Sequence, residues 1–310
     1  MAELDIKELL AALANPTEAV YGAEEEYEKK IDEVARRVVA SDTVRVLLLA
    51  GPSGSGKTTT ANLIADRIRA LGEKSLVVSL DNFYMASTDP RYPRLPSGER
   101  DFESPAALDN GIIISTLAKI INGEPFSVPR YDFKEGRATE TTEYESFSDG
   151  CVIIEGLHAL NPRLSDGFDG GAVLKLFVSV STNINEGAKR LISGKKMRFL
   201  RRMVRDNIYR GADAEKTLEL WPNVLAGEEA YLYPYKTVAD IMFDTFHIFE
   251  GAVLKPFADK LLSEALIKES PFAREVKKGI AKLPAYSCDI VPETSLIREF
   301  IPGGIYEDLY

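Results

Sequence analysis

Residues 51–58 read GPSGSGKT and fit the phosphate-binding pattern G-x-x-x-x-G-K-[ST]. The glycines of this stretch let the backbone curl so that successive N–H groups point inward, toward anionic oxygens. Lys57 can reach the terminal phosphates of a nucleotide, and Thr58 can offer its hydroxyl to Mg²⁺. The residues predicted to hold the nucleotide are Gly51, Ser53, Gly54, Ser55, Gly56, Lys57, Thr58 and Thr59.

The sequence on both sides of this loop supports the interpretation. Residues 44–50 (VRVLLLA) form a short apolar run that is long enough for a buried strand and too short for a helix. From Ala61 to Leu71, apolar residues recur with the spacing of one helix face, and Gly72 can end that helix. Strand, glycine loop and helix therefore follow one another in the order that the pattern requires.

The rest of the chain predicts an α/β fold of the P-loop NTPase type. With 310 residues, 45% of them hydrophobic, the chain is long enough for one α/β domain with extensions. Helical or irregular stretches separate most of the apolar runs, a pattern typical of a doubly wound, mainly parallel sheet of five strands. After residues 44–50, the predicted strands lie in residues 76–80, 151–154, 173–180 and 241–248.

Composition and charge narrow the functional classes. No apolar stretch approaches the roughly 18 to 20 residues that span a bilayer, so we expect a cytoplasmic protein without a membrane partner. The net charge of −10 argues against a nucleic-acid partner. Cys151 and Cys288 are the only cysteines and lie far apart, so neither a disulfide nor a zinc site is predicted.

One segment runs against the acidic balance of the chain. Residues 195–210 (KKMRFLRRMVRDNIYR) carry seven basic residues and one acidic residue. Either this segment is a solvated helix face, or it meets the phosphates held by the glycine loop.

Two carboxylates follow predicted strands, at the edge of the sheet where ligands bind in such folds. Asp81 follows the second strand, and we assign it to general-base and Mg²⁺ duty, with a turn-capping role as the alternative. Glu155 closes the third strand and is expected to orient magnesium directly or through water. The predicted metal ligands are therefore Thr58, Asp81 and Glu155.

Residues 85–150 form a long insertion that is rich in Pro, Gly, Arg and aromatic residues. We expect it to contain a helix over residues 105–121, with Ser104 as its N-cap. Residues 24–38 are predicted to form a surface helix, because apolar residues and i,i+4 ion pairs alternate around it. Insertions of this size are usually functional or disordered, and the predicted helix favours function. We therefore expect the insertion to be a substrate-binding segment.

Seven motifs follow one another along the chain: LLLAGPSGSGKTTTA, SLDNFY, RDFESPAALD, VPRYDF, CVIIEGLHALNP, RFLRRMVRDNIYRG and YPYKTVADIMF. Together and in this order they resemble the uridine kinase and phosphoribulokinase family of P-loop kinases, and above all its bacterial uridine kinase-like branch. The resemblance spans about residues 42–250, and it implies ATP or another NTP as donor, Mg²⁺ as cofactor and a small-molecule acceptor. An extra N-terminal module that longer members of this branch carry is not expected here.

Carried over by motif, the resemblance implies a role for individual residues. Asp206, within the arginine run, is expected to orient a neighbouring arginine. Residues expected at the acceptor are Tyr84, Glu103, Tyr131 and Arg198, and the catalytic set is Asp81, Lys57, Arg202 and Arg205. The expected parts are a helical extension (1–41), a kinase domain (42–250) with an insert (85–150) and a lid (about 194–230), and a C-terminal helical extension and tail (251–310).

The sequence departs from the uridine-cytidine kinase pattern at two places. Glu103 stands where the relatives have the Asp that binds ribose hydroxyls, and Gly136 stands where they have the His that reads the pyrimidine. His158, expected to bond to backbone, and His247, in an apolar strand, are not expected to replace that histidine. Aromatic surface for stacking is expected from Phe83, Phe102, Tyr131 and Phe133.

These observations predict an Mg²⁺- and ATP-dependent kinase that phosphorylates a primary hydroxyl, with the 5′-hydroxyl of a nucleoside as the leading acceptor. A sugar phosphate or a pantothenate-like acceptor is the first alternative. A nucleotide-gated binding module with little catalysis is the second. Homo-oligomerisation is left open, and residues 292–304 (PETSLIREFIPGG) are expected to form a docked tail.

Overall fold

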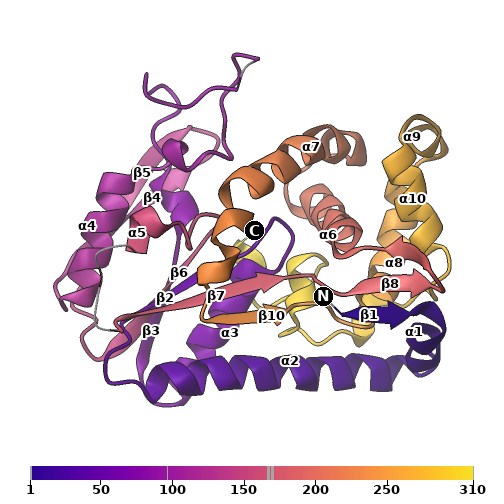
Figure 1. The fold of residues 1–310 in the computed structure, drawn as a ribbon, viewed down its shortest axis with the longest axis horizontal. Helices are drawn as coiled ribbons and strands as arrows, with labels where there is room; N and C mark the ends of the chain where they lie inside the picture. Colours follow the sequence, from indigo (N-terminus) through magenta and orange to yellow (C-terminus); the bar gives the residue numbers. More distant parts are fainter. Residues whose placement is uncertain (1, 96, 166–167, 169–170, 310) are drawn as a thin grey trace.

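The centre of the protein is a parallel sheet of five strands (Figure 1). The computed structural model describes residues 2–95, 97–165, 168 and 171–309. The strands lie in the order β10-β7-β2-β6-β3, and every neighbouring pair is parallel, which confirms the predicted sheet. The strands are β2 (Val46–Ala50), β3 (Lys74–Ser79), β6 (Gly150–Glu155), β7 (Val173–Ser179) and β10 (Ile241–Asp244).

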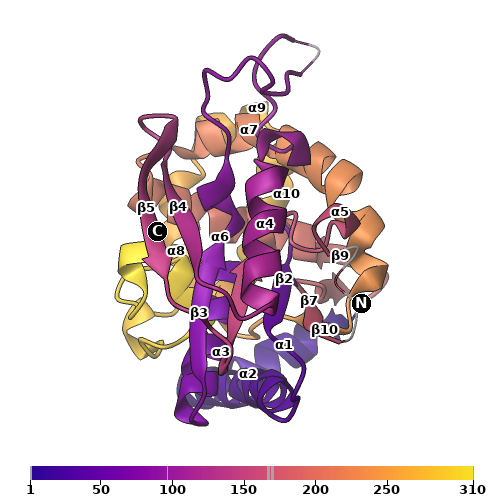
Figure 2. The same cartoon turned by 90° about the vertical axis from the view of Figure 1, so that its left-hand side faces the viewer.

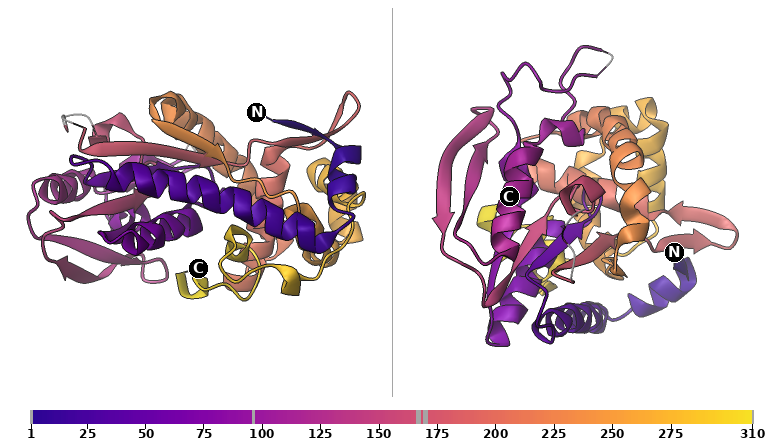
Figure 3. Two further views of the ribbon diagram at one scale, coloured as in Figure 1. Left: turned by 90° about the horizontal axis from the view of Figure 1, so that it is seen from below. Right: turned by 60° about the vertical axis from the view of Figure 1, so that its left-hand side comes forward.

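Helices cover both faces of this sheet, because the side chains of its strands alternate between two cores. Leu47 and Leu49 of β2 pack in one core with α2 and α3, and Leu48 packs in the other with α4. The first of these helices runs along the length of the molecule (Figure 3). The bounds are α2 (Pro16–Val39), α3 (Lys57–Ala70) and α4 (Asn110–Ile121).

The inserted segment differs from its prediction at one point. Ser104 caps only a short 3₁₀ turn, because Leu108 is drawn into a β-bridge with Tyr84 and the helix starts afresh after Asp109, its N-cap. The chain between the first two 3₁₀ turns projects beyond the rest of the fold (Figure 2). The remaining elements are η1 (Leu80–Phe83), η2 (Pro105–Ala107), the antiparallel hairpin β4 (Phe126–Asp132) and β5 (Arg137–Tyr144), and α5 (Pro162–Ser165).

The first forty residues contain more structure than the predicted surface helix. That helix is part of the longer α2, which Asn15 caps, and a strand precedes it. The strand, β1, pairs in parallel with β8 and completes a second, three-stranded sheet. Its parts are β1 (Glu3–Asp5), β8 (Asn183–Glu186) and β9 (Lys189–Ile192), with α1 (Ile6–Ala12) beside them.

Helices α6 and α7 follow the second sheet and include the basic segment. The chain then returns through β10 to three further helices and a series of 3₁₀ turns. Of these turns, η4 contacts α2 and η5 contacts α3. Within the described residues, no helix is both long and apolar enough to cross a membrane. The bounds are α6 (Gly194–Tyr209), α7 (Ala214–Tyr231), α8 (Glu250–Leu261), α9 (Glu264–Glu269), α10 (Pro271–Ile280), η3 (Tyr233–Val238), η4 (Cys288–Ile290), η5 (Leu296–Glu299) and η6 (Glu307–Leu309).

Candidate active site

The glycine loop connects β2 to α3 as predicted. Gly54 and Gly56 have φ angles of 72° and 85°, in the left-handed region that glycine adopts without strain. Gly56 is also the N-cap of α3, so the helix starts directly at the loop and directs its positive end there. Lys57 extends back across the loop, with its Nζ 3.3 Å from the carbonyl oxygen of Pro52. Ser55 lies buried within the same loop.

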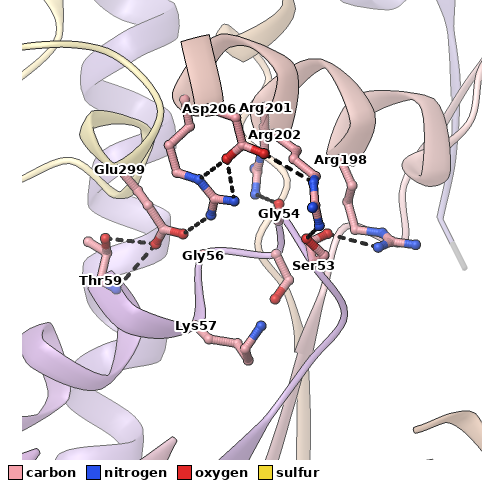
Figure 4. A network of polar contacts seen from close by, with 12 residues as sticks. Ser53, Gly54, Gly56, Lys57, Thr59, Arg198, Arg201, Arg202, Asp206 and Glu299 are labelled. Carbon is pink, nitrogen blue, oxygen red and sulfur yellow. Dashed lines mark hydrogen bonds and ion pairs between the residues drawn. The ribbon is translucent and has the colours of Figure 1, made fainter. Parts of the chain in front are cut away.

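Helices α6 and α7, which span the predicted lid, both contact this loop, and Figure 4 shows the α6 arginines beside Ser53 and Gly54. The carboxylate of Glu228 in α7 accepts the N–H of Ser53 at 2.9 Å. Arg198 in α6 donates to the Ser53 carbonyl at 2.8 Å and to both oxygens of Glu228 at 2.7 and 2.9 Å. Arg202 donates to the Ser53 hydroxyl at 2.8 Å. The loop is therefore clamped from the lid side.

A second buried arginine, which the sequence reasoning did not single out, supports the same loop. Arg201 forms a double ion pair with Glu250, at 2.5 and 3.0 Å, and donates to the carbonyl oxygen of Gly54 at 3.3 Å. It also donates to the carbonyl of Thr245 after β10 at 2.7 Å. Arg201 belongs to the same basic segment, 195–210, as Arg198. The clustering of basic residues in that segment was therefore the sequence feature that could have identified it.

Asp206 forms ion pairs with the remaining arginines of the basic segment 195–210. Its carboxylate lies 3.2 Å from Arg202, 3.0 Å from Arg205 and 3.5 Å from Arg210, which confirms the prediction that it orients its neighbours. The basic segment is thus not simply a solvated helix face, because most of its guanidinium groups are paired with carboxylates inside the protein.

The carboxylates Asp81 and Glu155 lie at the ends of the neighbouring strands β3 and β6, where Ser79 pairs with Glu155. Burial raises the pKa of Glu155 to about 7, while Lys57 acts in the opposite direction and Asp81 adds to the rise. Asp81 reaches the surface, yet desolvation by the surrounding protein raises its pKa, against the charges of Lys57 and Arg205. The lysine and both carboxylates therefore share one electrostatic environment.

This donor set suits a magnesium ion bound to nucleotide phosphates. Thr58 opens α3 beside Lys57, and the two carboxylates are hard oxygen ligands. Among the described residues, no cluster of three His, Cys, Asp or Glu side chains could hold a metal by itself. Mg²⁺ commonly keeps several waters and takes phosphate oxygens, so one or two carboxylates and a hydroxyl are sufficient.

Two of the predicted acceptor residues, Tyr84 and Tyr131, form an aromatic cluster with Phe133. The rings of Tyr84, Tyr131 and Phe133 lie in mutual contact, with centroids 5.0 to 5.8 Å apart, and the Tyr84 hydroxyl donates to the carbonyl oxygen of Phe102 at 2.9 Å. Phe102 and Phe133 are 48% and 62% exposed, so they can offer stacking surface. For Phe83 that prediction is wrong, because the 3₁₀ turn after β3 directs its ring into the core, where it is 2% exposed. Tyr131 is also buried, at 8% exposed, because Tyr84 and Phe133 pack on its ring, so it offers little stacking surface.

Glu103 is half-buried between the insert and the lid. A Cβ placed on Gly227 of α7 would lie 2.5 Å from the Glu103 Cβ, so the two backbones approach closely because this position has no side chain. Burial raises the pKa of Glu103 to about 7, and the nearby charge of Arg202 opposes the rise. Arg198, expected at the acceptor, instead faces Glu228 and Ser53 in this conformation.

Comparison with known proteins agrees with this architecture. Residues 46–248 match the model of the phosphoribulokinase/uridine kinase family. The chain belongs to this family. A uridine kinase of Staphylococcus epidermidis is 30% identical over 201 residues, which cover 64% of this chain and 86% of that protein. Uridine kinase-like protein 5 of Arabidopsis thaliana is 28% identical over 199 residues, and the match spans only 38% of that longer protein.

The solved structures support the fold alone. A "putative fructose transport system kinase" from Silicibacter sp. TM1040 superposes with a TM-score of 0.50 at 20% identity, over 69% of this chain and 98% of that one. The family match confirms the resemblance read from the seven motifs, and the parallel sheet is that of a P-loop kinase. The roles of the individual site residues stay predictions.

Both histidines of the chain, His158 and His247, are buried. His158 is buried, which lowers its pKa to about 4, and a hydrogen bond to the backbone of Glu103 acts against that shift, in line with the predicted backbone bond. His247 follows β10 rather than lying in it, with Nδ1 3.0 Å from the Thr245 carbonyl oxygen, and burial lowers its pKa to about 3. Both rings are therefore neutral near pH 7.

Proposed function

We propose that this protein is a cytoplasmic ATP- and Mg²⁺-dependent kinase that transfers the γ-phosphate to the 5′-hydroxyl of a nucleoside. The observation that carries the proposal is the place of Asp81. Asp81 lies in the turn η1 directly after β3, beside the end of β6 where Glu155 lies, and Tyr84 ends the same turn. The charges of Lys57, Arg210 and Arg205 act on the pKa of Asp81, and burial and the Asp81 charge raise the pKa of Tyr84. A carboxylate between a phosphate cradle and an aromatic surface is suited to take a proton from an acceptor hydroxyl.

In this proposal, residues of the chain mainly position and neutralise, because phosphoryl transfer demands little covalent chemistry from a protein. The glycine loop and Lys57 bind the phosphates, and Thr58 with Glu155 and Asp81 would hold Mg²⁺, which neutralises phosphate charge when bound. Asp81 then accepts the proton of the attacking hydroxyl. Arg202 and Arg205 stabilise negative charge on the transferring group.

The lid contributes by excluding water from the site. Helices α6 and α7 contact the glycine loop through Arg198, Arg202 and Glu228, so the loop and the lid are mechanically linked. Water would otherwise compete with the acceptor hydroxyl as nucleophile. We assign catalysis to residues 42–250 and treat residues 1–41 and 251–310 as extensions that support them.

A second acceptor class is favoured by one observation. Gly136, at the position of the pyrimidine-reading histidine, has a φ of 66°, and a Cβ there would lie 2.4 Å from the Ser87 hydroxyl oxygen. The local turn therefore excludes a histidine without rearrangement, which removes a source of base selectivity. A sugar phosphate or a pantothenate-like molecule is the acceptor of this second candidate.

The test is a phosphorylation screen of the purified protein with ATP and Mg²⁺ against nucleosides, sugars, sugar phosphates and pantothenate. Phosphate transfer to a nucleoside, lost in Asp81→Asn, supports the first candidate, and transfer only to another class supports the second. An ATPase rate that no acceptor stimulates would contradict both and favour a nucleotide-gated binding module.

A further inference from the structure

The C-terminal segment 295–301 is built into the protein beside the glycine loop. All seven of its residues are buried. Ser295 donates to the carboxylate of Glu24 in α2 at 2.5 Å, and the Leu296 side chain packs so closely on Gly56 that a Cβ there would lie 2.6 Å from it. The ring of Phe300 lies 5.0 Å from the Arg201 guanidinium. The segment therefore touches the loop and the arginine that supports it.

Glu299, at the end of η5, reaches furthest into the site (Figure 4). One carboxylate oxygen accepts from Thr59, from its N–H at 3.3 Å and from its hydroxyl at 2.9 Å. The other lies 3.5 Å from the guanidinium of Arg205 in α6. The side chain is 4% exposed. A single buried carboxylate thus bridges the first turn of α3 and the lid helix.

Both partners have a structural reason to need this carboxylate. The N-cap of α3 is Gly56, which has no side chain to accept the N–H groups of the first turn, and Glu299 supplies that acceptor from 240 residues away. Arg205 has Asp206 on one side and Glu299 on the other. Removing Glu299 would leave the guanidinium with one anchor and a larger choice of orientations.

We propose that Glu299 is a positioning residue of the kinase site, which fixes the first turn of α3 and orients Arg205 toward the transferring phosphate. The C-terminal segment is then part of the phosphate-binding unit. The effect on catalysis rests on the proposed function, whereas the coupling between η5, α3 and α6 does not. Glu299 accepts from Thr59 in the first turn of α3, next to the loop where phosphates would bind. Its negative charge there also repels the phosphates and so opposes nucleotide binding.

The test compares Glu299→Gln with Glu293→Gln, an exposed glutamate two residues before this segment, in the full-length protein. Glu299→Gln should lower kcat by about 10- to 10²-fold, the cost of a small misplacement of a catalytic group, without raising the KM for ATP. In an Arg205→Ala background the same change should lower kcat by a clearly smaller factor than in the wild type, because part of its effect acts through Arg205. Glu293→Gln should match wild type. A raised KM for ATP, or full additivity with Arg205→Ala, would overturn the proposal.

A second measurement does not depend on turnover. Hydrogen exchange should speed up in residues 203–209 and at the start of α3 in Glu299→Gln, but not in Glu293→Gln. If Glu299→Gln does not fold, the reciprocal Arg205→Ala should speed exchange in residues 296–299, and unchanged exchange there would refute the coupling. If wild type phosphorylates no acceptor, the proposed function fails while these exchange rates still decide the role of Glu299.

Discussion

The donor side of the site and its acceptor side are built in different ways. The donor side, residues 51–59 with the arginines of α6, is held by buried ion pairs such as Arg198–Glu228 and Arg201–Glu250. Within the described residues, the acceptor side has no such ion pairs among Tyr84, Glu103, Tyr131 and Phe133: Phe133 is exposed, Tyr84 and Glu103 are half-buried, and the neighbouring strand β5 is mostly exposed. Breaking a buried pair costs several kcal/mol, about 3 to 5, whereas exposed positions tolerate change.

This difference suggests that phosphoryl transfer and the choice of acceptor depend on different parts of the protein. In the proposed function, the phosphates are bound by a loop that buried ion pairs of α6, α7 and α8 hold in place, so we expect phosphate binding to be insensitive to changes in the insert. Acceptor choice would depend on side chains of the insert, which fewer contacts hold. We therefore expect donor-side variants to lose turnover and acceptor-side variants to change selectivity.

The largest effect is expected from Lys57→Ala. Single transition-state donors are worth about 10² to 10³ in kcat, and Lys57 also carries a full charge, so we expect a loss of about 10³-fold or more. Thr58→Ala should also abolish most turnover, but by removing a metal ligand, and raised Mg²⁺ should partly restore it. Steady-state assays over an Mg²⁺ series distinguish the two. Equal rescue of both variants would break the assignment of separate roles.

Asp81→Asn tests the group that joins the two sides. The substitution keeps shape but removes charge and basicity, so kcat should fall by about 10²- to 10⁴-fold while ATP binding largely survives. Asp149→Asn is the matched control, because Asp149 pairs with Lys74 at the opposite end of the same strand pair. If Asp81→Asn turned over at the wild-type rate, Asp81 would be only a turn cap.

The pH dependence of both the stability and kcat/KM should reflect the ionisation of Glu155. Its pKa rises from the ordinary 4.5 to about 7, so the folded protein binds more protons than the unfolded chain between these values. The free energy of unfolding should therefore fall as pH rises through this window, and Glu155→Gln should remove part of that slope. Because Mg²⁺ needs the ionised form, kcat/KM should rise about tenfold per pH unit up to about 7. A flat profile from pH 5 to 8 would contradict this role.

The sequence was sufficient wherever the chemistry is local. The glycine loop, Lys57 and the strand-end carboxylates Asp81 and Glu155 belong to short patterns, and the parallel sheet follows from runs of apolar residues. It was insufficient where partners are distant in the chain. Arg198 meets Glu228 after 30 residues, Arg201 meets Glu250 after 49, and Thr59 meets Glu299 after 240.

Two local errors have a different cause. Phe83 follows a strand and is aromatic, so its pattern resembles that of the exposed rings, but the direction of a side chain in a 3₁₀ turn depends on the tertiary packing. The predicted helix from residue 105 breaks because Leu108 pairs with Tyr84 across the insert. In both cases a tertiary contact outside the local sequence pattern determined the structure and outweighed the local conformational preference.

The smallest expected effect concerns Glu103 and selects among acceptors. A carboxylate with a pKa near 7 can accept or donate hydrogen bonds to vicinal hydroxyls at neutral pH, so ribosides should be better substrates than 2′-deoxy analogues by about 10-fold. Glu103→Gln should erase much of that gap in kcat/KM with little change in ATP hydrolysis without acceptor. Because Gly136 occupies a left-handed turn that disfavours a histidine there, selectivity for uridine and cytidine over purine nucleosides should be weak. Strong pyrimidine selectivity would show that another residue reads the base, and that the acceptor side is as fixed as the donor side.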